Sequence, residues 1–180
     1  MLVQHVSPEV SFLPAEPHPW YALRVRARHE GSIAAILRER GYVEFLPHYT
    51  STRRWSDRIR QQEQPLFPGY LFCQFDYNRR LPVLTTPGVI HIVGMGKLPR
   101  PVDEGEIRAL QAVVGSGLLL QPWPFLKPGQ RVTIQDGPLR NVEGTISSLD
   151  GRDRLIVSIT LLQRSVAVCI ERAWVRPHAA

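Results

Sequence analysis

The number and grouping of the arginines give the clearest chemical indication in this chain. They indicate the binding of phosphate. Among 22 Lys+Arg, lysine occurs only at Lys97 and Lys127. Guanidinium groups bind phosphate in a bidentate manner and stack on bases. The formal net charge of +6 suits a phosphate-bearing partner, and it equally suits simple solubility.

Residue types used in catalysis and metal binding are present without the spacing that those uses require. The six histidines share no ligand spacing, and Cys73 and Cys169 form no CxxC pair. The run from Gly94 to Lys97 lacks the spacing of a phosphate-binding loop, so we expect a β-turn. No nucleophile and base pair can be assigned. The sequence therefore predicts no enzyme activity, no cofactor and no metal.

Two groups of basic residues are our candidates for contact with nucleic acid. The first group comprises Arg24, Arg26, Arg28 and His29. It falls where a predicted strand ends and a predicted helix begins, and helix amides together with arginines attract phosphate. The second group, Arg53 and Arg54, is adjacent to Trp55, whose ring can stack on a single-stranded base. A solvated charged rim is the alternative for both groups.

The pattern before residue 114 predicts an α+β domain. Strand alternation, a helical stripe ended by Gly41 and a capping box at Asp103 and Glu106 support this prediction. The expected strands are 20–26, 42–46, 70–75 and 89–93, and the expected helices are 29–40, 78–84 and one that follows the capping box. The polar, basic segment 50–64 is either a hairpin or a mobile loop.

The pattern after residue 126 predicts strands only, and five short strands in so small a segment favour a barrel. The expected strands are 131–134, 142–147, 155–159, 165–170 and 174–175. Because Val, Ile and Thr dominate them, we expect a stable barrel that does not convert to a helical hairpin. The predicted organisation is a disordered leader at 1–18, a first domain at 19–113, a Gly- and Pro-rich linker at 114–126 and a second domain at 127–178.

Two motifs carry a resemblance to a known family. The first is Phe67-Pro68-Gly69-Tyr70 before an aromatic strand, and the second is Asp136, Gly137 and Pro138 followed by Gly144. Their order resembles the NusG family of transcription elongation factors, in which an NGN domain precedes a KOW domain. The resemblance implies an NGN α/β sandwich, with a four-stranded antiparallel sheet and helices, followed by a five-stranded SH3-like KOW β-barrel.

The resemblance also implies a partner, RNA polymerase. By matching residues, Phe67, Tyr70 and Phe72 fall in the aromatic patch that grips the two clamp helices of the β′ subunit, together with Met95, Ile107 and Leu110. The alternative is burial of both faces of strand 70–75, with Ile107 and Leu110 in the core. Arg79 and Arg80 are assigned to the gate loop of the β subunit, although the His-Thr-Thr run of the RfaH-like branch is absent. The same resemblance places non-template DNA at Arg26, Arg28 and His29.

The barrel differs from general NusG proteins at one position that the family uses to bind a partner. Leu161 and Leu162 replace a Phe-Gly-Arg run whose phenylalanine docks on a ribosomal protein. The loss of the phenylalanine argues against coupling to the ribosome, while the resemblance still implies a second partner for the barrel, a ribosomal protein or Rho, at these leucines. The departure favours a specialised RfaH-, UpxY- or LoaP-like paralogue that acts on long operons.

The predicted function is that of a transcription elongation and antitermination factor that bridges the polymerase cleft and suppresses pausing. We expect a cytoplasmic protein, because no signal peptide is recognisable and no stretch approaches the ~18 apolar residues of a membrane span. We also expect a monomer. One alternative is a KOW-containing protein that binds the ribosome or RNA. Another is an enzyme whose site escapes recognition.

Overall fold

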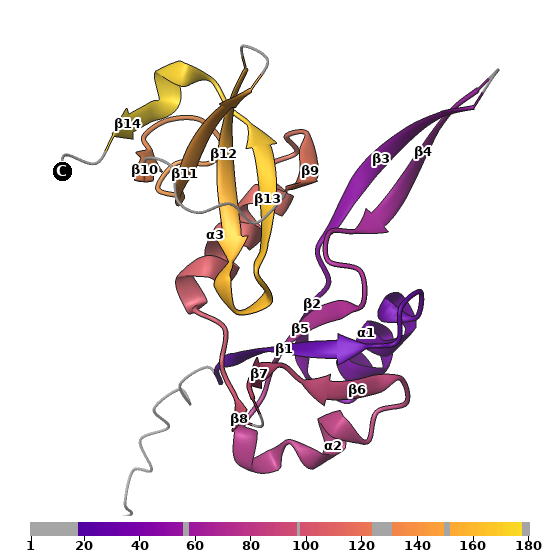
Figure 1. The fold of residues 1–180 in the computed structure, drawn as a ribbon. Helices are drawn as coiled ribbons and strands as arrows, with labels where there is room; N and C mark the ends of the chain where they lie inside the picture. The colour runs from indigo at the N-terminus through magenta and orange to yellow at the C-terminus, as the bar shows by residue number, and fades with distance from the viewer. Residues whose placement is uncertain (1–17, 56–57, 97, 124–130, 150–151, 178–180) are drawn as a thin grey trace, which may run out of the picture.

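The computed structural model describes residues 18–55, 58–96, 98–123, 131–149 and 152–177. These residues form an α+β domain followed by a small all-β domain (Figure 1). The first domain contains β1 (Trp20–Val25), α1 (Glu30–Glu39), β2 (Val43–Phe45), β3 (His48–Trp55), β4 (Arg58–Pro65), β5 (Tyr70–Gln74), η1 (Tyr77–Arg79), α2 (Leu81–Leu84), β6 (Val89–Ile92), β7 (Gly94–Met95), β8 (Leu98–Pro99) and α3 (Glu104–Gly115).

The first domain is built on a four-stranded antiparallel sheet, as expected, and its strands lie in the order β2-β5-β1-β6. The apolar stripe of α1, Ile33 and Leu37, packs with Leu71 and Phe75 of the central sheet region. Alternating side chains of β5 point to opposite faces, so Phe72 belongs to the other face and to a second cluster. Both faces of β5 are therefore covered by apolar side chains.

Three local predictions in this domain are resolved by the structure. Segment 50–64 is a hairpin, because β3 and β4 pair over eight register positions from His48 opposite Pro65 to Trp55 opposite Arg58. The expected helix 78–84 is divided into η1 and α2, with Pro82 in the first turn of α2, where a missing N–H is tolerated. The expected turn at Gly94 is a two-residue hairpin of β7 and β8.

The second domain is a curved antiparallel sheet in the order β14-β10-β11-β12-β13-β9. Its elements are β9 (Leu120–Trp123), β10 (Arg131–Ile134), β11 (Glu143–Leu149), β12 (Arg152–Ile159), η2 (Thr160–Leu162), β13 (Arg164–Cys169), η3 (Arg172–Trp174) and β14 (Val175–Pro177). Four of the five expected strands are present within three residues of their predicted bounds, and the fifth, expected at 174–175, is β14 at Val175–Pro177, because Trp174 ends η3. The segments 155–159 and 165–169 are strands and not helices.

The predicted linker 114–126 differs from the structure, because it contains β9. This strand pairs with β13 and buries Leu120. Its Pro122 is compatible with an edge position, where one missing donor faces no further strand. The glycine and proline residues of this segment are typical of a linker, so the sequence did not predict this short strand at the edge of the sheet.

The two glycines of the barrel motif are required by close packing. Gly137 has φ +78°, and a Cβ there would lie 2.9 Å from the ring of Trp174. At Gly144, a Cβ would lie 2.7 Å from the carbonyl oxygen of Ile156 on the neighbouring strand. Both positions confirm the predicted turn and close backbone approach, with Asp136 and Pro138 exposed beside them.

One hydrophobic cluster extends through both domains. It joins Trp20, Phe67 and Phe72 of the first domain to Leu110 of α3 and Val157 of the barrel. In Figure 1 the turn between β12 and β13 lies against the four-stranded sheet. The domains are thus packed together in this conformation. In the described part of the chain, no helix is long and apolar enough to cross a membrane.

Candidate functional site

The turn from Phe67 to Tyr70 is the centre of the candidate site. The N–H of Tyr70 donates to the carbonyl of Phe67 at 3.0 Å, and the N–H of Val25 donates to the carbonyl of Gly69 at 2.9 Å. Gly69 supplies the left-handed φ of +79° that this turn needs. The turn is therefore closed upon itself and tied to the end of β1.

Glu30 holds the same turn from a second side. Its side chain is only 4% exposed, and its Oε1 accepts a hydrogen bond from the N–H of Gly69 at 2.7 Å. A carboxylate that accepts from an N–H gives a stronger hydrogen bond than a neutral acceptor. The sequence did not indicate this role, because an acid in the first turn of a helix is ordinarily a solvated partner of the helix dipole.

Replacing Gly69 with Ala is expected to lower the free energy of unfolding by about 1–2 kcal/mol, since a left-handed φ is costly for any residue with a Cβ. The new Cβ would also lie 2.6 Å from Nη1 of Arg24. Chemical denaturation measures the change. Gly31→Ala is the matched control, because its Cβ meets nothing within 4 Å in α1 and alanine favours helix. Equal stabilities of the two variants would contradict the proposed strain.

Tyr70 is contacted by arginines from both domains. Cζ of Arg24 lies 4.7 Å from the centroid of the tyrosine ring, and Cζ of Arg164 from the barrel lies 5.5 Å from it. Such cation–π contacts are worth about 0.5–1 kcal/mol at exposed sites. Arg24, which is also a predicted nucleic-acid contact, packs on Tyr70 in this conformation. Arg164 links the barrel to the aromatic turn.

The expectation that Phe67 and Phe72 form an exposed patch does not hold in this conformation. Their side chains are 2% and 0% exposed, within the cluster that the two domains share. The burial alternative is the one observed. Half-buried Leu161 and Leu162, predicted to bind a second partner, pack against the same cluster. The sequence alone could not show that residues of these two predicted sites belong to one hydrophobic cluster.

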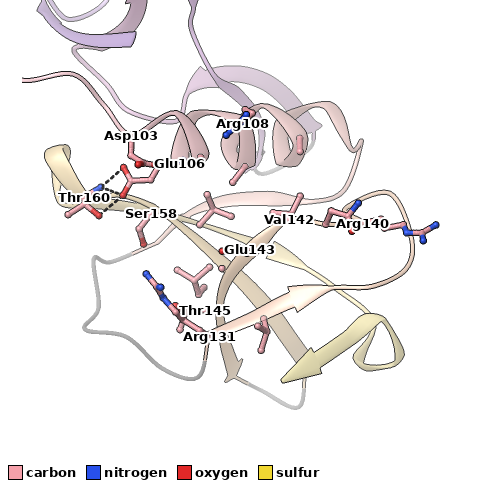
Figure 2. Close-up of a pocket in the computed structure, with 18 residues that line it drawn as sticks. Asp103, Glu106, Arg108, Arg131, Arg140, Val142, Glu143, Thr145, Ser158 and Thr160 are labelled. Atoms are coloured by element: carbon pink, nitrogen blue, oxygen red, sulfur yellow. Dashed lines mark hydrogen bonds between the residues drawn. The ribbon is translucent and has the colours of Figure 1, made fainter. Parts of the chain in front are cut away.

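A carboxylate of the first domain binds the turn of the barrel (Figure 2). Glu106 accepts from the N–H of Thr160 at 3.1 and 3.2 Å and from its hydroxyl at 2.5 Å. The predicted capping box is half formed, because Oδ1 of Asp103 accepts from the N–H of Glu106 at 3.0 Å. The carboxylate of Glu106 reaches the other domain instead of returning to residue 103.

The other predicted polymerase-contact residues are spread over the first domain. Ile107 and Leu110 are fully buried, so the core alternative holds for them in this conformation. Met95 is 65% exposed on the β7–β8 hairpin. Arg79 and Arg80 are exposed at η1, where Arg80 lies over the ring of Tyr77 at 4.5 Å.

The predicted nucleic-acid residues fall in two separate places. Arg26, Arg28 and His29 are exposed together at the N-terminus of α1, and Arg28 adopts a φ of +67°. Arg53 and Arg54 are in β3 of the hairpin, and their side chains lie outside the described part of the structure. The two groups are therefore separate candidates.

A groove of about 1100 Å³ lies between α3 and the barrel (Figure 2). Its described lining includes three arginines and three acids but no histidine or cysteine; these charged residues are Arg108, Arg131, Arg140, Asp103, Glu106 and Glu143. Within the described residues no three His, Cys, Asp or Glu side chains are grouped to hold a metal. Balanced charges give this groove no preference for an anion.

Cys73 is the buried thiol of the first domain. Burial, with a smaller effect of Glu44, raises the pKa of the Cys73 thiol to about 12. The thiolate is the nucleophilic form of cysteine, so this side chain remains protonated and inert at neutral pH.

The fold is that of a two-domain protein, with a helix-backed antiparallel sheet followed by a small β-barrel. The family model described as "Transcription termination factor nusG" matches residues 18–111. This chain therefore belongs to the NusG family of transcription termination/antitermination factors. Its homologues in this family are transcription factors.

The relatives extend over both domains. The NusG protein of Pasteurella multocida is 26% identical over 168 residues, which cover 84% of this chain and 91% of the relative. The NusG protein of Escherichia coli K12 is 27% identical over 165 residues, which cover 83% and 90%. The solved structure described as "Domain interaction in Thermotoga maritima NusG" aligns at a TM-score of 0.49 and 22% identity, over 88% of this chain and 96% of that one.

Proposed function

We propose that this chain is an elongation and antitermination factor that binds RNA polymerase through Phe67, Tyr70 and Phe72. The observation that carries the proposal is the aromatic turn, which is held rigid by Glu30 and Gly69. Aromatic anchors in rigid settings are the residues that contribute most to protein interfaces. The proposed partner surface is the pair of clamp helices of the β′ subunit.

Binding at this face requires the barrel to move away first. The polar contacts that join the two domains at the turn are the Glu106–Thr160 hydrogen bonds and the Arg164–Tyr70 contact. Thr160 and Arg164 are exposed, and exposed polar contacts contribute little stability. Only open molecules can bind polymerase through this face. The apparent affinity is therefore the affinity of the open form multiplied by the fraction of molecules that are open.

Further contacts complete the bridge across the polymerase cleft. Met95 is exposed and available at the edge of the first domain, whereas Ile107 and Leu110 become available only if α3 separates from the barrel. Exposed Arg79 and Arg80 would contact the gate loop of the β subunit. A factor that holds both sides of the cleft keeps the clamp closed and suppresses pausing.

The barrel would bind a second partner, a ribosomal protein or Rho, through Leu161 and Leu162. These side chains are half-buried in the closed chain, so the second partner also gains full access only on opening. The replacement of the family's Phe-Gly-Arg run by leucines supports a specialised, operon-specific role. We place this activity in the cytoplasm, with the chain as a monomer.

Non-template DNA is the proposed ligand of Arg26, Arg28 and His29. Residues 19–113 contain 14 Lys+Arg and 9 Asp+Glu, a net charge of 14 − 9 = +5. We expect Arg26→Gln with Arg28→Gln to reduce the slope of log affinity against log salt by about 1.4, at ~0.7 per lost single-strand contact. Fluorescence anisotropy with labelled single-stranded DNA measures the slope.

The matched control for that experiment removes two arginines from the barrel. Arg131 and Arg140 are both exposed, so Arg131→Gln with Arg140→Gln changes the net charge by the same amount. Equal slope losses in the two double variants would show a general charge effect. An unchanged slope after the Arg26 and Arg28 substitutions would assign those arginines to a solvated rim.

Capture from a bacterial extract distinguishes the proposed function from its alternative. The tagged full-length chain is expected to retain core RNA polymerase, with Tyr70→Ala retaining less and Tyr70→Phe an equal amount. The alternative is a barrel that binds ribosomal RNA. Capture of ribosomal particles in the absence of polymerase, unaffected by Tyr70→Ala, would contradict the proposal.

A further inference from the structure

The ring of Tyr70 accepts a cation from the barrel in addition to the one that its own domain supplies. Arg24 lies directly opposite Tyr70 in the register of β1 and β5, and its Cζ is 4.7 Å from the ring centroid. Arg164 of β13 places its Cζ 5.5 Å from the same centroid. A tyrosine ring attracts cations to its negatively polarised face within about 6 Å. The turn therefore binds a cation that does not belong to the first domain.

The side chain of Arg164 is free to take other positions, because the residue is exposed. Holding a long, exposed arginine in one place costs rotamer freedom, so its contact with the ring must offset that cost. Two guanidinium groups near one ring also repel each other. The carboxylate of Glu30, which accepts from the N–H of Gly69 at 2.7 Å, adds negative charge beside the turn and reduces this repulsion. The aromatic turn is thus suited to a second cation.

Apolar side chains accompany Arg164 on the same turn of the barrel. Leu161 and Leu162 pack against the cluster that contains Phe67 and Phe72, and in Figure 1 the turn between β12 and β13 lies against the four-stranded sheet. Leu161 precedes Arg164 by three residues, a spacing that places two side chains on one face when it occurs in a helix. The barrel therefore offers the aromatic turn one cationic and one apolar group together. A partner that displaces the barrel meets the same surface.

We infer that the polymerase presents an arginine to the ring of Tyr70, in the place that Arg164 takes in the closed chain, with an apolar side chain three or four residues away on the same helix. The inference rests on the proposed function and adds the chemistry of the partner's contact group. Arginine fits better than lysine, because its planar and weakly hydrated guanidinium stacks on aromatic faces. An acidic contact group would be drawn to Arg24 and away from the negatively polarised ring face.

Fluorinated phenylalanines at position 70 test for this cation, because each fluorine withdraws charge from the ring face and leaves the apolar area nearly unchanged. The full-length chain carries Arg164→Ala in every variant, so that the internal contact is absent throughout. Relative to Tyr70→Phe, the mono-, di- and trifluoro rings should bind core RNA polymerase progressively more weakly, reaching about fivefold for the trifluoro ring. Surface interferometry measures the dissociation constants, and thermal melting checks that the fold is retained.

Arg24 also contacts the ring, so the series is repeated with Arg24→Gln. The stepwise loss should persist there, because it comes from the partner, and its disappearance would assign the effect to Arg24 and overturn the inference. Tyr70→Leu, which keeps an apolar side chain without a π face, should bind as weakly as the trifluoro ring. Binding of Tyr70→Leu equal to that of Tyr70→Phe would overturn the inference. Stronger binding on fluorination would indicate an acidic contact group and would overturn it as well.

Failure of the proposed function gives a different result from failure of this inference. Weak binding of Tyr70→Ala, combined with equal binding of all the fluorinated rings, would overturn the arginine contact and leave the aromatic face as the polymerase site. A chain that binds no polymerase, or in which neither Tyr70→Ala nor fluorination changes the dissociation constant, would overturn both. Weak binding of Tyr70→Ala together with the stepwise loss would support both.

Discussion

Truncating Phe67 to Ala is expected to lower the free energy of unfolding by about 3–5 kcal/mol, as large-to-small changes of buried phenylalanine do. Its side chain is 2% exposed and its ring packs edge-to-face on Phe72, with centroids 6.1 Å apart. Denaturant titration followed by circular dichroism measures the loss. Because this residue is part of the core, its removal cannot be read as a pure loss of binding.

Phe67→Leu is the control for that experiment. It keeps most of the apolar volume, so the expected loss is under about 1.5 kcal/mol. A loss below about 1 kcal/mol for Phe67→Ala would show that the ring is not packed in the shared core in solution. That result would favour an open chain in which the aromatic face is exposed, as the family resemblance alone implied.

Tyr70→Ala is expected to leave the fold intact and to weaken binding to core RNA polymerase by about 2 kcal/mol, roughly 30-fold. Tyr70 is half-buried, and its ring faces Arg24 and Arg164. The aromatic ring, and not the hydroxyl, is the expected contact. Surface interferometry with immobilised polymerase measures the dissociation constant.

Tyr70→Phe keeps the ring and is therefore expected to bind polymerase within about threefold of the unaltered chain. Full affinity in a folded Tyr70→Ala variant would remove the case for this face as the polymerase contact. An equal loss in Tyr70→Phe would assign the interaction to the hydroxyl, in place of the aromatic surface.

The fold was predictable where local pattern determines structure. Strand alternation located β1 and β5, the Gly41 stop ended α1, and the glycines of the barrel motif marked positions where a Cβ would collide with Trp174 or Ile156. These features depend on residues that are close in sequence or on a turn that tolerates only glycine. The four-stranded antiparallel sheet then followed from the family resemblance.

Long-range contacts were not predictable in the same way. Glu30 contacts a turn 39 residues away, and Glu106 contacts Thr160 across 54 residues. Glu30 looked like an ordinary acid in the first turn of a helix, and Glu106 was expected only to complete a capping box with Asp103. The strand β9 was hidden for another reason, because Pro122 and the nearby glycines resemble a linker. The sequence allowed burial of Phe67 and Phe72 as an alternative but could not decide it from one domain, because the cluster that holds them includes the barrel.

The most direct test of polymerase binding by the aromatic face, in competition with the barrel, is the dissociation constant of the full-length Glu106→Ala, Arg164→Ala variant for core RNA polymerase. Removing the Thr160 hydrogen bonds and the Tyr70 contact should destabilise the closed form by about 1 kcal/mol. The affinity should therefore rise about fivefold, and adding Tyr70→Ala should abolish the gain. If the Glu106→Ala, Arg164→Ala variant keeps its fold but binds polymerase equally or more weakly, the proposed competition between barrel and polymerase for this face is contradicted.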